Sequence, residues 1–182
     1  AGDTILEDAT EQVTSEFSPV GESASNGSVE NAIRQIRKQI RTLKLQLEDE
    51  TGEQLPEESH ILPWLVQYAA WTLYAFHKGS DGKTARQQTK GNASIQPGVC
   101  FGESIWYRPS KTTKHDLWGN CVWLGILDNS GEHIVGTKKG VVKCRSIKAR
   151  YGTDKYNVED IRTAQGTPWK PNQNITSWKI TT

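Results

Sequence analysis

The chain has few cysteines, no long apolar run and no paired metal-ligand pattern. Its cysteines, Cys100, Cys121 and Cys144, are an odd number without a C-x-x-C pair, which argues against a disulfide framework or a zinc site. We expect them to be small buried residues of a reducing compartment. No stretch approaches the roughly 20 apolar residues of a membrane span, and no charged start precedes an apolar signal region. These absences predict a protein of the nucleus or cytoplasm that is neither secreted nor membrane-bound.

Methionine is also absent, even at position 1. This absence leads us to expect that the 182 residues are cut from a longer polypeptide. Their number suits one domain or a domain and a half, and a hydrophobic content of 35% is adequate for a core.

Charge is distributed unevenly along the chain, although the net charge is only +1. Residues 1–99 hold 9 basic and 14 acidic residues, whereas residues 100–182 hold 13 basic and 7 acidic ones. This asymmetry favours a polyanion-binding part attached to a more acidic body. Ordinary solvated surface charge is the alternative.

The pattern of residues 28–48 predicts an amphipathic helix with two opposed faces. With about 100° per residue, its apolar residues occupy one arc, and its basic residues fall within another arc of roughly 120°. Glu30 falls inside the basic arc. The apolar stripe consists of Val29, Ile33, Ile36, Ile40, Leu43 and Leu47, and the basic arc holds Arg34, Arg37, Lys38, Arg41 and Lys44. One face is therefore expected to pack and the other to meet a polyanion.

Glu30 allows two interpretations. An acid in the first turn of a helix favours the helix dipole and can pair with Arg34 at i+4, which together stabilise a helix by roughly 0.3 to 1 kcal/mol. Alternatively, a carboxylate among bases can hold a divalent metal beside a phosphate, because the metal reverses the repulsion between acid and phosphate.

The rest of the chain reads as two helices followed by short strands. We expect an apolar, buried helix that starts after Ile61, with Pro63 in its first turn, and runs through Phe76, and a short helix at 84–90 closed by Gly91. Turns at 128–131 and 139–140 connect predicted antiparallel strands. The expected strands are 101–107, 121–127, 133–138 and 141–149, after a possible early strand at 12–17.

Two other signals fail as functional motifs. Gly82-Lys83-Thr84 lacks the glycine that a phosphate-binding loop needs five residues before its second glycine, since position 77 is His77. The four histidines have neither i, i+4 pairing nor a cysteine at zinc spacing, so we expect surface or core histidines.

Residues 17–33 contain Ser25-Asn26-Gly27 followed three residues later by Glu30. This segment resembles the region around the catalytic glutamate of retroviral-type integrases, which retrotransposon Pol polyproteins encode. The likeness spans most of residues 15–170, and the order and spacing of its motifs are specific together. The further matching segments are Leu62-Pro63-Trp64-Leu65-Val66, residues 79–84, Phe101-Gly102-Glu103, Trp123-Leu124-Gly125 and residues 131–137.

The resemblance implies an RNase H-like core in which two Asp and one Glu hold two divalent metals, Mg²⁺ or Mn²⁺ in the full-length parent. The glutamate maps to Glu30, as a catalytic residue and metal ligand, and Arg34 and Arg37 map to positions that contact the DNA end of the element. The two Asp residues of the family lie well before the Glu, and only 29 residues precede Glu30 here. The metal site within this chain is therefore expected to be incomplete.

The predicted fold class is α/β, the C-terminal part of an RNase H-like core followed by a small antiparallel β module, in a fragment. Residues 1–97 would belong to the core, 98–152 to a basic β module and 153–182 to an extended linker or tail. The predicted partners are DNA, as element ends and target, and further copies of the parent. The candidate DNA contacts are Arg34, Arg37, Lys38, Arg41, Lys138, Lys139, Lys143 and Arg145.

Two other functions remain open at this point. The chain could be a non-catalytic nucleic-acid-binding protein derived from an integrase, with basic surfaces but no complete set of acids. It could also be a helical protein-interaction module built on the stripe from Val29 to Leu47.

Overall fold

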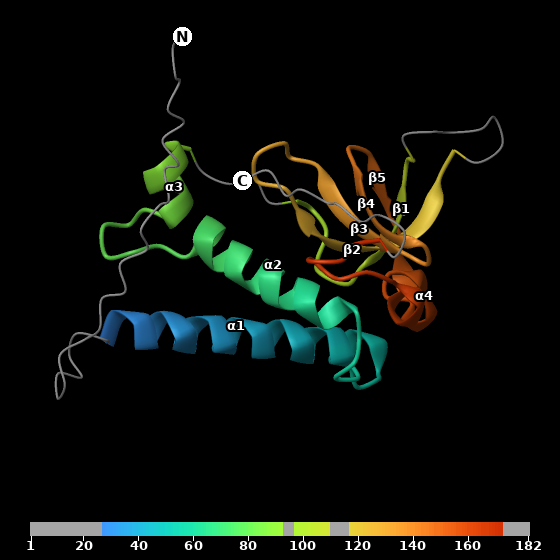
Figure 1. Ribbon diagram of the computed structural model, residues 1–182, viewed down its shortest axis with the longest axis horizontal. Coiled ribbons are helices and arrows are strands. Elements are labelled where there is room, and N and C mark those ends of the chain that lie inside the picture. Colours follow the sequence, from blue (N-terminus) through green and yellow to red (C-terminus); the bar gives the residue numbers. More distant parts are fainter. Residues whose placement is uncertain (1–26, 93–96, 110–116, 173–182) are drawn as a thin grey trace, which may run out of the picture. The chain divides into compact units, whose positions relative to one another are not determined.

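A computed structural model describes residues 27–92, 97–109 and 117–172 (Figure 1). The predicted early strand at 12–17 and the motif residues before Gly27 lie outside these described residues. The chain divides into two units, Ala1–Arg34 and Gln35–Thr182, and each is described by itself.

The predicted basic helix is present as α1, which spans Gly27–Thr51. It runs past Glu48, where the predicted helix ended, although acids are unfavourable near a helix C-terminus. Local hydrogen bonds account for the difference. The Thr51 hydroxyl donates to the Leu47 carbonyl at 2.7 Å, and Glu48 Oε1 accepts from the Leu55 N–H at 2.9 Å. Side chains of the last turn thus hold both a helix carbonyl and the segment that follows the helix.

The apolar helix is α2, Ile61–Phe76, which runs antiparallel to the second part of α1 (Figure 1). Its Ile61, Trp64 and Leu65 are buried, but Val66 is 45% exposed. We predicted a helix buried on nearly every side, and this prediction is wrong for the face that holds Val66, Gln67 and Ala70, because these residues are exposed in the described chain. The short helix α3, Ala85–Lys90, begins one residue later than predicted, because Thr84 is its N-cap and forms a capping box with Gln87, and Gly91 at φ 75° follows its last residue.

The strands of the described residues form one five-stranded antiparallel sheet in the order β4-β3-β2-β1-β5. The expected fourth strand is divided in two by Arg145 and Ser146, so that β5 leaves β4 and pairs with β1 on the other side of the sheet. The strands are β1 Ser104–Tyr107, β2 Gly119–Ile126, β3 His133–Thr137, β4 Gly140–Cys144 and β5 Ile147–Ala149.

This connection forces the sheet to curl. In a flat sheet, β4 and β5 would lie four strand spacings apart, roughly 19 Å at about 4.8 Å each. From Cys144 to Ile147 the chain takes three steps and reaches at most about 11 Å. The two edges must therefore approach each other, and the sheet has an inside and an outside, like a small barrel.

The two faces of the curled sheet belong to different hydrophobic clusters. The inner cluster includes Ile105, Cys121, Trp123 and Val135. The outer face contributes Val122, Leu124, Ile134 and Val141 to a cluster with Leu47 of α1 and Trp64 and Leu65 of α2. The sequence placed a domain boundary near residue 97, whereas in the structure residues on both sides of that position share one core.

Residues 152–172 are not extended, which corrects the predicted linker for this stretch. Gly152–Asp154 form a 3-10 helix, η2, and Val158–Thr163 form α4, capped by Asn157. Ile161 and Ala164 are buried. The Trp64 indole N–H donates to the Gly166 carbonyl at 2.9 Å, and the Gly166 N–H donates to His60 Nδ1 at 3.1 Å. A few apolar residues after a good N-cap are thus enough to bind this segment to α2 and the sheet.

The described part of the chain therefore combines helices with an antiparallel sheet, in line with the α/β class. Among its helices, none has the length and apolar character needed to cross a membrane.

A substitution at Gly102 would test how tightly α1 packs on the segment before β1. Its φ is +83°, and a methyl group built there would lie 2.5 Å from Leu47 Cδ1. We expect Gly102→Ala to reduce the free energy of unfolding by about 1–2 kcal/mol through backbone strain and by roughly 1–3 kcal/mol more through overpacking. Chemical denaturation measures the loss.

Gly91→Ala is the matched control, because Gly91 also has a positive φ but has no atom within 4 Å of the built methyl. It should show the strain alone. In a double-mutant cycle, Leu47→Ala should remove part of the cost of Gly102→Ala. Strictly additive effects would contradict the proposed contact.

Candidate nucleic-acid interface

The second part of α1 presents exposed cations opposite its packed stripe. Ile40, Leu43 and Leu47 lie in or against the core cluster, so helical spacing turns Arg37, Lys38 and Arg41 toward solvent, where all three are exposed. Within the described part of the chain, no carboxylate forms a salt bridge with any of them. Lys44 differs, because its ammonium lies 3.7 Å from Glu48 Oε1.

Glu30 and Arg34 belong to the first unit, Ala1–Arg34. Glu30 lies in the first turn of α1, and both side chains are exposed. The described residues contain no group of three or more His, Cys, Asp or Glu side chains that could share a metal ion. Glu30 is thus an accessible carboxylate without a ligand set around it in the described chain.

The basic residues of the sheet separate into two pairs instead of forming one patch. Lys138 and Lys139 are exposed at the turn between β3 and β4 and line a groove of about 370 Å³ with Asp160 and Thr163 of α4. Lys143 and Arg145 line a different groove of about 370 Å³. Arg145 Nε also lies 3.6 Å from Glu132 Oε1, and the Arg145 side chain is 85% exposed, so this pair is screened by water.

Arg108 is a functional candidate that the sequence analysis missed. It lines the same groove as Lys143 and Arg145, although 35 positions separate Arg108 from Lys143 in the chain. Its N–H donates to the Ser146 carbonyl at 3.0 Å, which continues the β1–β5 ladder by one residue. Only the pairing of β1 with β5 brings Arg108 to this groove.

Other cations are neutralised by buried or half-buried acids. Asp128 binds Arg86 Nε at 2.6 Å and Lys90 Nζ at 2.7 Å, which ties α3 to the turn after β2. Burial alone would raise the pKa of Asp128, but its hydrogen bonds to Lys90 and Arg86 hold that pKa below its ordinary value. Glu103, only 4% exposed, likewise pairs with Lys155 at 3.3 Å. These cations stabilise the fold and are poor candidates for phosphate binding.

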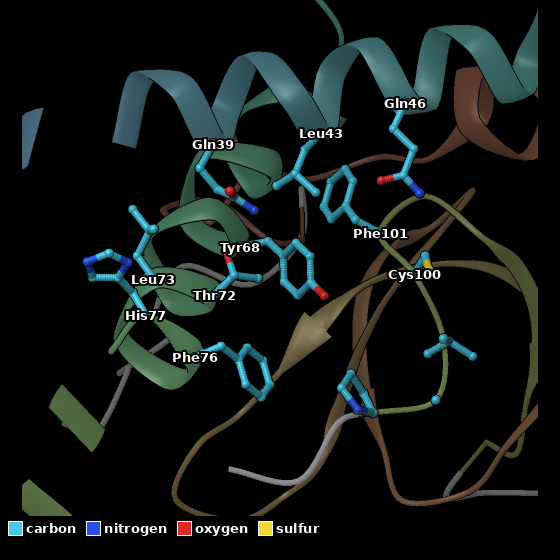
Figure 2. A pocket seen from close by; sticks show the side chains of 13 residues that line it. Gln39, Leu43, Gln46, Tyr68, Thr72, Leu73, Phe76, His77, Cys100 and Phe101 are labelled. Atoms are coloured by element: carbon cyan, nitrogen blue, oxygen red, sulfur yellow. The ribbon is translucent and has the colours of Figure 1, made fainter. Parts of the chain in front are cut away.

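A cavity of about 610 Å³ lies between α1, α2 and the segment 97–101 (Figure 2). Leu43 and Phe101 face Tyr68, whose ring stacks on Phe101 at a centroid distance of 5.5 Å. Burial, with smaller effects of Cys100 and Glu103, raises the pKa of the Tyr68 hydroxyl to about 12. No Lys or Arg lines this cavity, so it does not extend the basic surface.

Cys100 lies at the edge of this cavity and is exposed, whereas Cys121 and Cys144 are buried. The prediction of three buried cysteines is therefore wrong for Cys100. The reason is that Cys100 precedes β1 in a turn, outside the alternating inward positions of the strands. Partial burial and the nearby Glu103 carboxylate raise the pKa of the Cys100 thiol.

No protein-family model matches the sequence, and no curated protein or solved structure is significantly similar to it.

The thiols give a test of this arrangement. With a thiol-reactive reagent at pH 7.5, we expect one thiol per native chain to react and three in denaturant. The native reaction should be slower than that of free cysteine and should accelerate as the pH rises, because a raised pKa leaves less thiolate at neutral pH. Cys100→Ser should abolish the native reaction. Modification of a second thiol in the folded chain would contradict the burial of Cys121 and Cys144.

Proposed function

We propose that this chain is part of a retroviral-type integrase, in which it supplies one carboxylate, Glu30, and a DNA-binding surface. The proposal starts from the resemblance of residues 17–33 and of the later motifs to that family. It is supported by the exposure of Glu30 and by the exposed cations on α1. The parent protein would transfer DNA strands in the integration of an element.

The unpaired cations of α1 are the observation that carries the DNA-binding part. Arg37, Lys38 and Arg41 are exposed and lack salt bridges to other described residues, so binding phosphates would break no ion pair of the fold. Each phosphate contact releases condensed counterions, and the affinity should therefore fall steeply with salt. Lys138 and Lys139 at the turn after β3 can add sequence-independent contacts.

The same proposal assigns the two parts of the chain to parts of an integrase. Residues up to about 97 would come from the end of an RNase H-like core, and the curled sheet would be the DNA-binding module that follows it. The order of helices before a small antiparallel sheet supports this assignment. In this chain the two parts would be fused through the shared core of α1, α2 and the outer face of the sheet.

The residues of the described chain do not make a complete site for Mg²⁺ or Mn²⁺. Glu30 would be one ligand, and the other carboxylates would come from residues outside the described chain. Divalent ions held by several carboxylates neutralise phosphate charge and activate the attacking oxygen, which a single exposed carboxylate cannot do. The contribution of the described residues by themselves is therefore binding.

The alternative functions differ in the support that they have. A non-catalytic nucleic-acid-binding protein is favoured by the same unpaired cations and requires no ligand set. A helical interaction module has less support, because Ile40, Leu43 and Leu47 of the predicted stripe already pack against the core of this chain.

Replacing the α1 cations tests the DNA surface. We expect the triple variant Arg37→Gln, Lys38→Gln, Arg41→Gln to weaken duplex binding at low salt. The slope of log K against log salt should become shallower by about 0.9 for each lost phosphate contact. Fluorescence anisotropy with a labelled duplex measures both effects.

The matched control is Lys78→Gln, Lys83→Gln, Lys170→Gln, which removes the same charge from exposed lysines outside α1. It should change the affinity much less. An equal loss in both triple variants would mean that net charge, and not the α1 surface, determines binding.

Glu30→Gln tests the catalytic part in the protein extended upstream of Ala1. Strand transfer with Mg²⁺ or Mn²⁺ should be lost while duplex binding persists, because the amide keeps the size of the side chain but not its charge. Glu57→Gln, at another exposed glutamate, should leave transfer unchanged. Unchanged transfer in Glu30→Gln would refute the assignment of Glu30.

A further inference from the structure

The outer face of β2, β1 and β5 carries a row of three polar and aromatic side chains. The strand register pairs Trp106 of β1 with Asn120 of β2 on one side and with Lys148 of β5 on the other. Directly paired residues of antiparallel strands point to the same face of a sheet. Asn120, Trp106 and Lys148 therefore form one row across three strands.

A second row follows next to the first. Arg108 lies two residues after Trp106, and its N–H bonds to Ser146 in continuation of the β1–β5 ladder. Trp118 lies two residues before Asn120 and is 44% exposed. Arg108 and Trp118 lie one residue beyond β1 and β2, and continuing the strand alternation by that residue places them on the same side as Trp106. This face, defined by Trp106, Arg108, Trp118, Asn120 and Lys148, is called the tryptophan face.

The tryptophan face is not part of either core cluster. Ile105 and Cys121, the neighbours of Trp106 and Asn120 along the strands, point to the inner cluster. The outer cluster takes Val122, Leu124 and Ile134, farther along β2 and on β3. Trp106 and Trp118 are thus aromatic residues that the hydrophobic cores do not require.

Trp106 is held in place by a buried arginine. Arg150 is only 8% exposed, and its Nη1 lies 3.0 Å from Asp160 Oδ2. Its Cζ lies 5.3 Å from the centroid of the Trp106 ring. Nε and Nη2 of Arg150 have no hydrogen-bond partner among the described residues, so the ring adds a cation–π contact to the compensation that Asp160 gives to the charge. The ring is therefore fixed before any ligand arrives.

Lys148 is the second cation beside the Trp106 ring. Its Nζ lies 5.4 Å from the centroid of the same ring, but the residue is exposed and has no acid as an ion-pair partner among the described residues. Its long side chain can leave the ring for a phosphate and uncover the aromatic surface. Arg108, also exposed, supplies a second cation in the neighbouring row. The two rows contain no acid.

Aromatic rings beside cations on a sheet face suit a single-stranded nucleic acid. Unpaired bases stack on aromatic side chains while the backbone phosphates meet Lys and Arg. In a duplex the base faces are already stacked, so a duplex would use only the cations. The two tryptophans therefore favour the single strand, and the positive charge of Lys148 and Arg108 disfavours basic partners.

We propose that the tryptophan face binds single-stranded nucleic acid, with bases stacked on Trp106 and Trp118 and with phosphates at Lys148 and Arg108. This site goes beyond the duplex-binding surface of α1 and does not depend on the integrase assignment. The chemistry is common to DNA and RNA, and the choice between them is a matter for the experiment.

The test measures binding of the full chain to labelled 12-residue oligothymidylate and oligouridylate by anisotropy at low salt. We expect Trp118→Ala to weaken binding roughly five- to hundredfold, as for the loss of one stacked base. Lys148→Gln and Arg108→Gln should each make the salt slope shallower by about 0.7. Equal affinity for both oligonucleotides indicates recognition of the shared chemistry, and a preference identifies the natural strand.

Trp169→Ala is the matched control. Trp169 is 75% exposed, and its turn is followed by Pro171, which bonds to Val141 of β4 at the other edge of the sheet. Its replacement should leave single-strand binding unchanged. Trp106 contacts Arg150, so we choose Trp106→Phe, which keeps an aromatic ring, instead of Trp106→Ala. Thermal melting verifies that each variant folds. The smaller ring of Trp106→Phe should weaken binding less than Trp118→Ala does.

Three results would overturn the proposal. They are an unchanged affinity in Trp118→Ala and Lys148→Gln, an equal loss in Trp169→Ala, and binding of a duplex as tightly as the single strand with the same sensitivity to Trp118→Ala. If single-strand binding depends on Arg37, Lys38 and Arg41 alone, the proposal for the tryptophan face is wrong. The proposal that α1 binds DNA is then unaffected.

Discussion

The rest of the structure depends on the two-residue connection between β4 and β5. Because Arg145 and Ser146 must join opposite edges of a five-stranded sheet, the sheet curls and acquires an inside and an outside. The inside holds one cluster around Trp123, and the outside of β2 and β3 receives α1, α2 and α4. The same connection places β5 beside β1 and so creates the row of Asn120, Trp106 and Lys148. A longer connection would allow the same strand order in a flat sheet without an inside.

Ion pairing separates the basic residues into structural and available ones. Asp128, Glu103 and Asp160 are half-buried or buried, and each binds at least one cation that a count of charges would assign to a polyanion site. Among the described residues, the cations without such acids include Arg37, Lys38 and Arg41 of α1, Lys138 and Lys139 at the turn after β3, and Lys148. The surface available for phosphate binding is therefore smaller than the number of basic residues suggests. Its cations can bind phosphate without the loss of an ion pair of the fold.

Secondary structure could largely be predicted from the sequence, because it follows from local patterns. The apolar stripe placed α1, the apolar residues after Ile61 placed α2, Gly91 marked the end of α3, and the turns at 128–131 and 139–140 separated β2, β3 and β4. The break at Arg145 and Ser146 was missed because β4 and β5 together look like one continuous strand. Helix α4 was missed because six residues give too short a periodic pattern, and its stability comes from Ile161 packing on the core.

The sequence by itself determined α1, α2 and α3, most strands, the exposed cations of α1 and the motif around Glu30, because spacing along the chain decides which side chains share a helix face. Tertiary structure alone decided which cations are neutralised, that Lys138 and Lys139 separate from Lys143 and Arg145, and that Trp106 lies between Asn120 and Lys148. These outcomes depend on residues that are distant in the chain, such as Arg86 with Asp128 and Arg150 with Asp160. Their contacts arise only when the curl of the sheet brings its strands and the helices together.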